Sequence, residues 1–439
     1  MTRLTHLHEP FCTLSKEPVN QGDLVEGLAQ LATSGLTEIT ELVQAIHREI
    51  VLRPLGLYDS KGQRWWSKGL TSRVYDTVKD VMHHSGTGVA MGLRTWNFLT
   101  PYHKGKPLLP FQHFLVGVLN GVAGDHLVRL QNPLALNMMF YDRYAQPQRG
   151  EVRGRVVIMV HGLCLSHLSW DPTESVGLGE QLLYRQPKST ILYLNYNTGR
   201  RISQNGRSFA RLLEELVTKN PDITELDFIG HSMGGLVSRS ALFYGKQMGH
   251  SWLSKADNLV CLGSPHHGAV LERLGFLFLD KLGRIPFAGA LARLGEIRSA
   301  GVIDLRHGSV RDDDWEHQEQ RNGQYNDCRK PAPIPSHINA YMVAATIEDK
   351  PSTSKAMEAI GDYLVSIRSA LGEHDNPDYQ LRVPEDHKAV FYGMNHFEVQ
   401  YHPRVRDQVI AWLVPGAHVP PPRYKRIESV DPEEMAAGF

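Results

Sequence analysis

The chain has 439 residues, enough for one large α/β domain with an addition, and 41% of them are hydrophobic. Its 47 lysines and arginines balance its 47 aspartates and glutamates, which argues against a nucleic-acid partner because nucleic-acid binders carry a basic excess. The four cysteines are far apart and show no CxxC pair or Cys/His ligand spacing, so no zinc or other metal site is expected.

No export or membrane-crossing segment is recognisable in the sequence. The N-terminal stretch lacks the continuous apolar region of a secretory signal, and no window of about 18 residues is uniformly apolar. The nearest stretch, residues 113–124 (HFLVGVLNGVAG), is too short and is predicted to form a buried or interfacial helix. We therefore expect a cytoplasmic protein, with peripheral association with a membrane as a second option.

Residues 1–150 are predicted to form a helical N-terminal region. Apolar residues recur every three to four positions between residues 28 and 50, with charged residues between them, and residues 72–93 continue this pattern. The polar faces of these helices mix both signs of charge. Packing against the following domain is therefore favoured over binding to a membrane surface, which would call for a basic face.

From residue 151 to residue 415 the pattern changes to short β-branched runs that alternate with helical stretches. Continuous apolar strands alternating with helices are typical of a mostly parallel sheet with helices on both faces, so the predicted fold class is α/β. The expected strands are 155–160, 189–196, 225–230, 258–263, 338–347 and 387–393, and the clearest helices are 203–219, 233–248 and 403–414.

Residues 269–335 interrupt this alternation after the fourth strand and are interpreted as a lid insertion. The leucines and phenylalanines of residues 269–295 fit a lid over an acyl chain, and equally a helical pair packed on the sheet, so both lipase and esterase activity stay open. The acidic run Asp312-Asp313-Asp314 is interpreted as a solvated face. Residues 416–439 are expected to form an extended tail.

The stretch 228–237 (FIGHSMGGLV) places a G-x-S-x-G motif between a predicted strand and a predicted helix. The flanking glycines remove Cβ atoms that would collide in a sharp turn, and the turn lifts Ser232 above the strand ends as a candidate nucleophile. It also leaves the Met233 N–H free at the start of the helix, where it can meet a developing negative charge. The loop after the first strand offers the Leu163 N–H as the second oxyanion donor.

A serine nucleophile needs a base that takes its proton and an acid that orients the base. In this topology the chain order is serine, acid, histidine. His396 lies on the loop after the last predicted strand and is the candidate base. Asp362 follows the strand 338–347 and is the candidate acid, with Glu348 and Asp349, nearer the strand end, as competing choices.

Taken together, these motifs resemble those of the α/β-hydrolase superfamily, in particular its bacterial lipase/esterase-like group. They are also similar to those of the inositol-deacylase-like lipases that remodel GPI anchors. The segments VHGL, GHSMGG, GSPHHG, GDYLVSIRSALG and NHFEV stand in the family's order over roughly residues 150–415. The resemblance implies an α/β-hydrolase fold with a lid insertion, and the set of motifs is far more specific than any one of them.

The resemblance also implies roles for individual residues. It implies a catalytic triad of Ser232, Asp362 and His396 with Leu163 and Met233 as oxyanion-hole donors. In many relatives the acid motif reads Gly-Asp-Gly followed by Leu-Val-Pro, whereas Tyr363 and Ser366 replace the second glycine and the proline here.

The predicted function is hydrolysis of carboxylic esters through an acyl-enzyme, with no metal or organic cofactor. The expected partner is a small-molecule or lipid ester substrate. Two alternatives stay open: an acyltransferase that uses the same triad, and a lipid- or membrane-binding protein in which the hydrolase domain is a scaffold.

Overall fold

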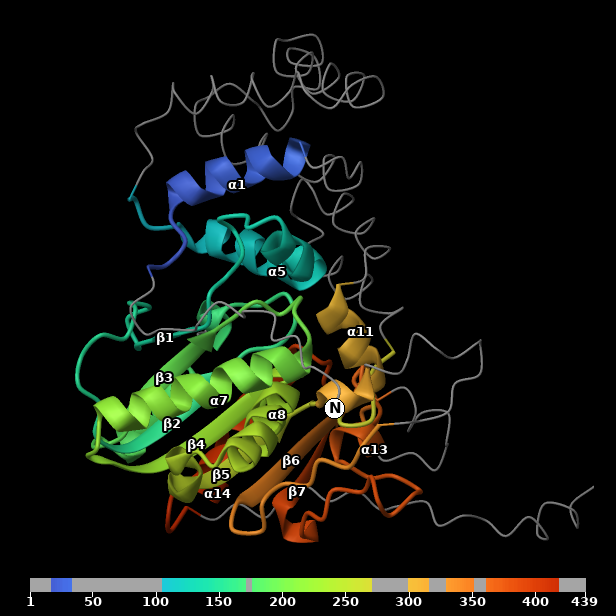
Figure 1. Cartoon of the computed structure of the whole chain (residues 1–439). Coiled ribbons are helices and arrows are strands. Elements are labelled where there is room, and N and C mark those ends of the chain that lie inside the picture. The colour runs from blue at the N-terminus through green and yellow to red at the C-terminus, as the bar shows by residue number, and fades with distance from the viewer. Residues whose placement is uncertain are drawn as a thin grey trace, which may run out of the picture.

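The computed structural model describes residues 17–33, 105–170, 176–270, 299–315, 329–350 and 361–417. Their centre is a seven-stranded sheet with the strand order β1-β3-β2-β4-β5-β6-β7 (Figure 1). The strands are β1 (Met139–Tyr141), β2 (Gly154–Val160), β3 (Thr190–Asn195), β4 (Ile223–His231), β5 (Ala256–Leu262), β6 (Asn339–Thr346) and β7 (Lys388–Tyr392). All neighbouring pairs are parallel except β1 with β3, which is antiparallel.

Helices cover both faces of this sheet because its central strands are apolar on both sides. Val156 and Ile158 of β2 belong to one buried cluster, and Val157 and Met159 belong to the other. The first cluster includes side chains of α7 (Ile202–Lys219), α8 (Met233–Met248), α11 (Ala300–His307) and α13 (Ile367–Ala370). The second includes side chains of α6 (Leu178–Arg185) and α14 (Pro403–Leu413). Each fully buried Val, Leu, Ile, Phe or Met side chain contributes about 1.5–3 kcal/mol to the free energy of folding. The two apolar clusters, one on each face of the sheet, therefore supply most of the stabilisation.

The predicted α/β fold class is confirmed, and each of the six expected strands is present with ends shifted by one or two residues. Helices α7, α8 and α14 agree equally well with the expected helices. Strand β1 was not predicted, because three residues are too few to show a periodic pattern. It precedes residue 151, where the hydrolase domain was expected to begin, and nevertheless extends the sheet at the β3 edge.

Two helices of the N-terminal region are described, α1 (Gln21–Thr33) and α5 (Pro110–Arg129), and α5 lies between α1 and the sheet in Figure 1. Leu24, Leu28 and Leu31 of α1 are buried. Helix α5 contains the expected helix 113–124 and is bent at Ala123, which has non-helical backbone angles. Helical packing is therefore present in the described part of this region.

Several expectations concern residues outside the described part of the chain. They include the helix at 72–93, the leucines and phenylalanines of the lid between residues 271 and 298, and the tail beyond residue 417. The division of the chain into a helical region, a hydrolase domain and a tail therefore stays a prediction. No helix among the described residues is both long enough and apolar enough to cross a membrane.

Candidate active site

The sequence-predicted site residues gather at the carboxyl edge of the sheet, where parallel α/β sheets bind their ligands. Ser232 follows β4, Leu163 follows β2 and His396 follows β7. These three residues line one cavity together with Leu165, Phe397 and other mainly apolar residues. The topology thus brings together groups that lie up to 233 positions apart, from residue 163 to residue 396.

Ser232 occupies the sharp turn between β4 and α8. Its backbone angles are φ 53° and ψ −121°, in a region that residues with a side chain rarely adopt. The turn is tight because a Cβ on Gly230 would lie 2.4 Å from the Gly235 nitrogen, and one on Gly234 would lie 2.0 Å from the Val160 oxygen. Only glycine fits at either position, which explains the glycines around the serine.

Two backbone N–H groups lie beside this turn. Met233 is the first residue of α8, so its N–H has no acceptor within the helix. The loop that carries Leu163 passes close by, since a Cβ on Gly162 would lie 3.0 Å from Cβ of Ser232. Within the described part of the chain, neither the Leu163 nor the Met233 N–H donates to a protein acceptor. Both amides are therefore available to a ligand oxygen.

Helix α5 of the N-terminal region packs directly on the Leu163 loop. A Cβ on Gly121 would lie 2.2 Å from Sγ of Cys164, and one on Gly117 would lie 2.9 Å from the Leu165 oxygen. Cys164 itself has a φ of 61°, an uncommon value for a residue with a side chain. The glycine-bearing side of α5 thus lets its backbone approach the loop and hold it in this conformation.

His396 and Asp362 form a buried pair. Nδ1 of His396 lies 2.7 Å from Oδ2 of Asp362, and the residues are 2% and 0% exposed. The other carboxylate oxygen of Asp362 accepts from the N–H groups of Leu364 (3.0 Å) and Val365 (2.8 Å). Because the carboxylate takes up Nδ1, Nε2 is the nitrogen that is left for chemistry.

The competing acids are not paired with this imidazole. No hydrogen bond among the described residues joins the His396 ring to Glu348 or Asp349. Gly263, at the end of β5, leaves room for the pair, since a Cβ there would lie 3.3 Å from Oδ2 of Asp362 and 3.4 Å from Nδ1 of His396. The geometry therefore favours Asp362.

The two departures from the family's acid motif are accommodated locally. Tyr363 has a φ of 82°, so it adopts the left-handed conformation that glycine normally supplies, and its side chain is half-exposed. Ser366 caps α13, where its side chain accepts a hydrogen bond from the Ser369 N–H. The turn around Asp362 thus forms without the usual glycine and proline.

His231, the variable residue before the nucleophile, was missed by sequence reasoning. It is 1% exposed, and its Nε2 donates to the carbonyl oxygen of His396 at 3.0 Å. It therefore ties the turn of Ser232 to the loop of His396. Nothing in the sequence signals this contact, because it joins residues 165 positions apart.

The interpretation of the acidic run as a solvated face was wrong for Asp314. This residue is 3% exposed, and its carboxylate accepts from the N–H groups of Val310 (2.9 Å), Arg311 (3.0 Å) and Lys330 (2.8 Å). It caps a buried turn, whereas Asp313 of the same run is partly exposed. The sequence gives no sign that one aspartate of the run is buried, since only the fold decides which of the three points into the protein.

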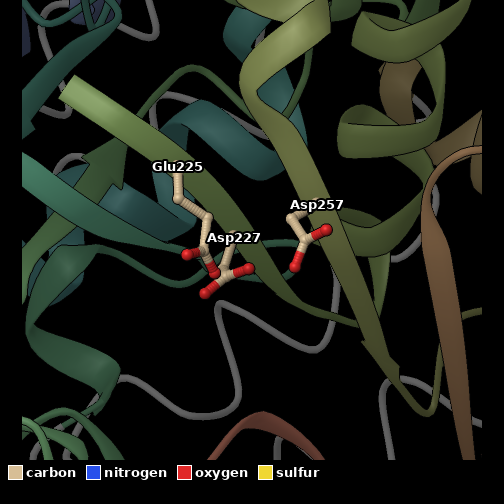
Figure 2. A group of neighbouring side chains, drawn as sticks. All are labelled: Glu225, Asp227 and Asp257. Carbon is tan, nitrogen blue, oxygen red and sulfur yellow. The ribbon is translucent and has the colours of Figure 1, made fainter.

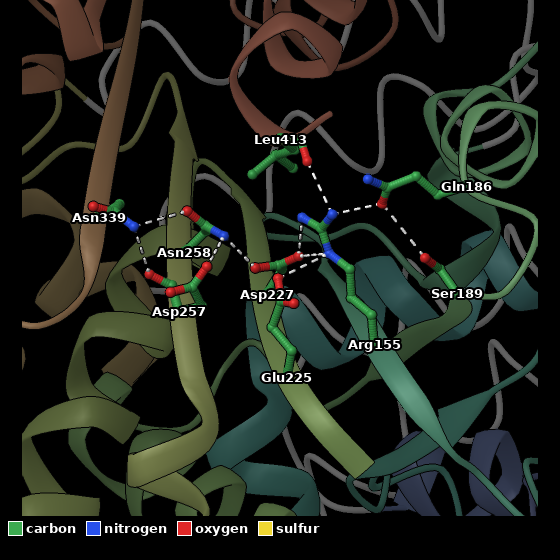
Figure 3. Close-up of polar contacts among 9 residues, drawn as sticks. All are labelled: Arg155, Gln186, Ser189, Glu225, Asp227, Asp257, Asn258, Asn339 and Leu413. Carbon is green, nitrogen blue, oxygen red and sulfur yellow. Dashed lines mark hydrogen bonds and ion pairs between the residues drawn. The ribbon is translucent and has the colours of Figure 1, made fainter. Parts of the chain in front are cut away.

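A second polar cluster lies at the opposite, amino edge of the sheet. Glu225, Asp227 and Asp257 place carboxylate oxygens within 4.8 Å of one another (Figure 2). The neighbouring Arg155 donates to Asp227 at 2.6 Å and forms an ion pair with Glu225 at 3.1 Å. Figure 3 shows the polar contacts around this arginine. This arginine already supplies the positive charge that a metal ion would bring.

Further hydrogen bonds complete the amino-edge cluster. Asn258 donates to Asp227 at 2.6 Å, and Arg155 donates to the Leu413 carbonyl at 2.9 Å (Figure 3). Burial raises the pKa of Asp227 to about 6, and the nearby Arg155 opposes that rise. The carboxylate thus has partners on both oxygens, and the cluster fastens α14 to the sheet.

The sheet order and the sharp strand–turn–helix at Ser232 are those of the α/β-hydrolase fold. Residues 151–374, about half of the chain, match the family model of the PGAP1-like alpha/beta domain, and the protein belongs to this family. No curated protein is similar enough to the chain to count as a match.

Three solved structures of bacterial proteins are among those similar to this chain. The mature form of lipase BlEst2 from Bacillus licheniformis is 17% identical, with 63% of this chain and 97% of that chain covered and a TM-score of 0.38. The product of the gene lin2722 from Listeria innocua is 12% identical, with 64% and 100% covered and a TM-score of 0.34. A lipase-esterase related protein from Clostridium acetobutylicum is 10% identical, with 59% and 94% covered and a TM-score of 0.32.

Proposed function

We propose that this protein is a serine hydrolase that cleaves carboxylic esters through an acyl-enzyme. The observation that carries the proposal is the presence in one cavity of Ser232, on a strained turn, and of His396, whose Nδ1 lies 2.7 Å from Asp362. A serine, a base and an orienting acid at one rim of the sheet are the groups that acyl transfer needs.

In the first step Oγ of Ser232 attacks the ester carbonyl carbon while Nε2 of His396 takes its proton. Asp362 keeps the Nδ1–H in place and stabilises the imidazolium that forms. The carbonyl oxygen becomes an oxyanion, and it accepts from the N–H groups of Leu163 and Met233. The dipole of α8 adds to this stabilisation, because its positive end lies at Met233.

The tetrahedral intermediate then collapses. The bond between the carbonyl carbon and the alcohol oxygen breaks, and the alcohol leaves with the proton from Nε2 of His396. A water molecule gives a proton to His396 and attacks the acyl-enzyme, and a second collapse releases the carboxylic acid and restores Ser232. These proton transfers use the chain's own groups throughout.

The lining of the cavity supports an apolar acyl group as part of the substrate. Leu165, Leu305, Leu364 and Phe397 line it around the serine. An apolar wall favours the hydrocarbon part of an ester over a charged one. A series of p-nitrophenyl esters from acetate to palmitate tests this point: kcat/KM is expected to rise with chain length, and preference for acetate would exclude the lipase form of the proposal.

The experiment that tests the function is Ser232→Ala, assayed on p-nitrophenyl esters and with a fluorophosphonate probe. We expect kcat to fall by roughly 10⁴–10⁶-fold and labelling to disappear. Ser254→Ala, a serine outside the cavity, is the matched control and is expected to keep both. Retained turnover in a Ser232→Ala protein with a native circular dichroism spectrum would refute the assignment.

A further inference from the structure

A second cavity lies beside the catalytic one, separated from it by the loop after β5 and by the end of α11. Ala269 and Leu305 line the catalytic cavity, whereas His267 and Gly308 line the second one. The two cavities share no lining residue. The second cavity therefore offers a separate binding volume, and none of its residues takes part in the proposed ester chemistry.

Arg239 of α8 forms part of the wall of this second cavity and is only 6% exposed. Its Nε donates to the Ala332 carbonyl at 3.0 Å, and its Nη1 donates to Nδ1 of His266 at 3.2 Å. These bonds use two of the five N–H groups of the guanidinium. No carboxylate of the described residues forms an ion pair with it.

Within the described part of the chain no carboxylate is bonded to Arg239, and the nearby negative charge is that of Asp314, which lines the same cavity and raises the pKa of the guanidinium. Burial and the neighbouring Arg329 lower the pKa of Arg239 to about 10, which still leaves the guanidinium positively charged at neutral pH. A buried cation is costly unless an anion or several acceptors compensate it. The two neutral acceptors that Arg239 has, a carbonyl and an imidazole, carry no negative charge.

The surroundings add positive charge and donors. Arg329 and Lys330 line the same cavity, and Arg329 donates to the carbonyl of His266 at 2.9 Å. The lining carboxylate of Asp314 is already taken up by three backbone N–H groups, and that of Asp378 is on an exposed residue. Among the described lining residues, three cationic side chains thus stand beside two carboxylates, one of which already accepts from three N–H groups and one of which belongs to an exposed residue.

We propose that this second cavity binds a phosphate group, with the guanidinium of Arg239 as its principal contact and with Arg329 and Lys330 as supporting charges. A planar guanidinium matches two phosphate oxygens, and a compact oxyanion supplies acceptors for the N–H groups of Arg239 from which no described residue accepts. The phosphate is either a free ion or part of a lipid headgroup. The site does not depend on the proposed ester hydrolysis.

The primary test is calorimetric titration of the full-length protein with inorganic phosphate at constant ionic strength. We expect saturable binding by the native protein and at least tenfold weaker binding by Arg239→Gln, because a hydrogen bond to a charged group contributes about 1.5–3 kcal/mol. Arg153→Gln, an exposed arginine at the amino edge of the sheet, is the matched control and should bind as the native protein does. Phosphate should also raise the unfolding midpoint of the native protein and of this control.

A second variant keeps the test decisive if Arg239→Gln does not fold. Lys330 lines the cavity from an exposed position, so Lys330→Gln should fold normally and bind phosphate more weakly. Phosphate affinity that is unchanged in the folded variants would overturn the proposal. So would the absence of saturable binding by the native protein both to phosphate and to the vesicles described next.

Vesicle flotation distinguishes the two sources of the phosphate group. Vesicles of phosphatidic acid in phosphatidylcholine are compared with vesicles of phosphatidylcholine alone. A lipid headgroup would be identified as the ligand if the protein were retained on the vesicles that contain phosphatidic acid. This retention should be lost in Lys330→Gln and should be competed by inorganic phosphate. Calorimetric binding of phosphate without retention on vesicles would identify a soluble phosphate.

Discussion

The two edges of the central sheet carry polar clusters of opposite character, although the same strands β2, β4 and β5 lead into both. At the amino edge Arg155, Asp227 and Asn258 use their charged and amide groups on one another. At the carboxyl edge the backbone of Ser232 is strained, and the N–H groups beside it have no acceptor among the described residues. At the amino edge these hydrogen-bonding groups are paired with one another, whereas at the carboxyl edge backbone N–H groups beside a cavity are available to a ligand.

This difference teaches how to separate structural from functional polar residues in a fold of this kind. A saturated network lowers the free energy of the folded chain and leaves nothing for a ligand. Strained backbone angles and unused donors raise that free energy, so they persist only where the surrounding structure enforces them, and such features cluster at functional sites. The following predictions test whether activity and stability divide between the two edges in this way.

The largest effect is expected for Asp362→Asn at the carboxyl edge. If the amide oxygen keeps the bonds from Leu364 and Val365, the amide NH2 takes the place of Oδ2 and cannot accept the Nδ1–H of His396, so the ring loses its orientation and kcat should fall by about 10⁴-fold. The side-chain oxygen can still accept from Leu364 and Val365, so the unfolding midpoint should change little. Hydrolysis rates on p-nitrophenyl butyrate measure the loss.

The matched control is Asp349→Asn, the competing acid after β6, which should keep native activity. If Asp349→Asn abolished turnover while Asp362→Asn retained it, the acid assigned in the proposed mechanism would be wrong. Asp362 would then no longer count as a functional residue of the carboxyl edge.

The converse result is expected for Asp227→Asn at the amino edge. It removes the charge that Arg155 and Asn258 contact, and the loss of hydrogen bonds to a buried charged group should lower the free energy of unfolding by about 3 kcal/mol. The kcat of the folded variant should stay native, because the cluster is at the far end of β4. Urea unfolding and ester hydrolysis on the same sample measure both quantities. A large fall in kcat without a loss of stability would contradict the division.

A smaller effect concerns acid stability beside the carboxyl edge. His167 is 3% exposed and stacks on Tyr141, and burial lowers its pKa from 6.5 to about 3. Because the folded-state pKa lies below the unfolded one, the unfolded chain binds the proton first. Its contribution to stability is therefore complete above about pH 6.5 and is lost as the pH falls towards 3.

Replacing this ring with one that does not titrate should reduce the loss. His167→Phe is expected to lose roughly 2 kcal/mol less stability than the native protein between pH 7 and pH 4.5. The measurement is the free energy of urea unfolding at both pH values. His337→Phe, at an exposed position, serves as the control and should follow the native curve. An equal loss of unfolding free energy between pH 7 and pH 4.5 in His167→Phe and in the native protein would show that this histidine does not contribute to the acid sensitivity of the fold.

Much of the framework was accessible from the sequence because its signals are local. The central strands read as continuous apolar runs, and α7 and α8 show regular helical spacing, so periodicity alone located them. Strand β1 carries no such signal, and it is held by pairing with β3 rather than by its own pattern. The burial of Asp314 was invisible for the same reason, since it depends on the backbone N–H groups that the fold brings to it.

The candidate site divides in the same way. The turn at Ser232 was predictable because glycines at fixed spacing on either side of a serine answer a local steric demand. The choice among Asp362, Glu348 and Asp349 was not, since all three follow the same strand. Only the position of the His396 ring, which comes from a loop 34 residues further along, distinguishes them.

By itself the sequence determined which segments form strands and helices, where the chain turns sharply, and in what order a serine, an acid and a histidine follow one another, because each depends on neighbours along the chain. The tertiary structure alone decided that His396 meets Asp362, that α5 packs on the loop of Leu163, and that Arg239 lines a cavity with no carboxylate of the described residues bonded to it. The physical reason is that close packing and charge compensation act between atoms that are near in space, whatever their separation in sequence.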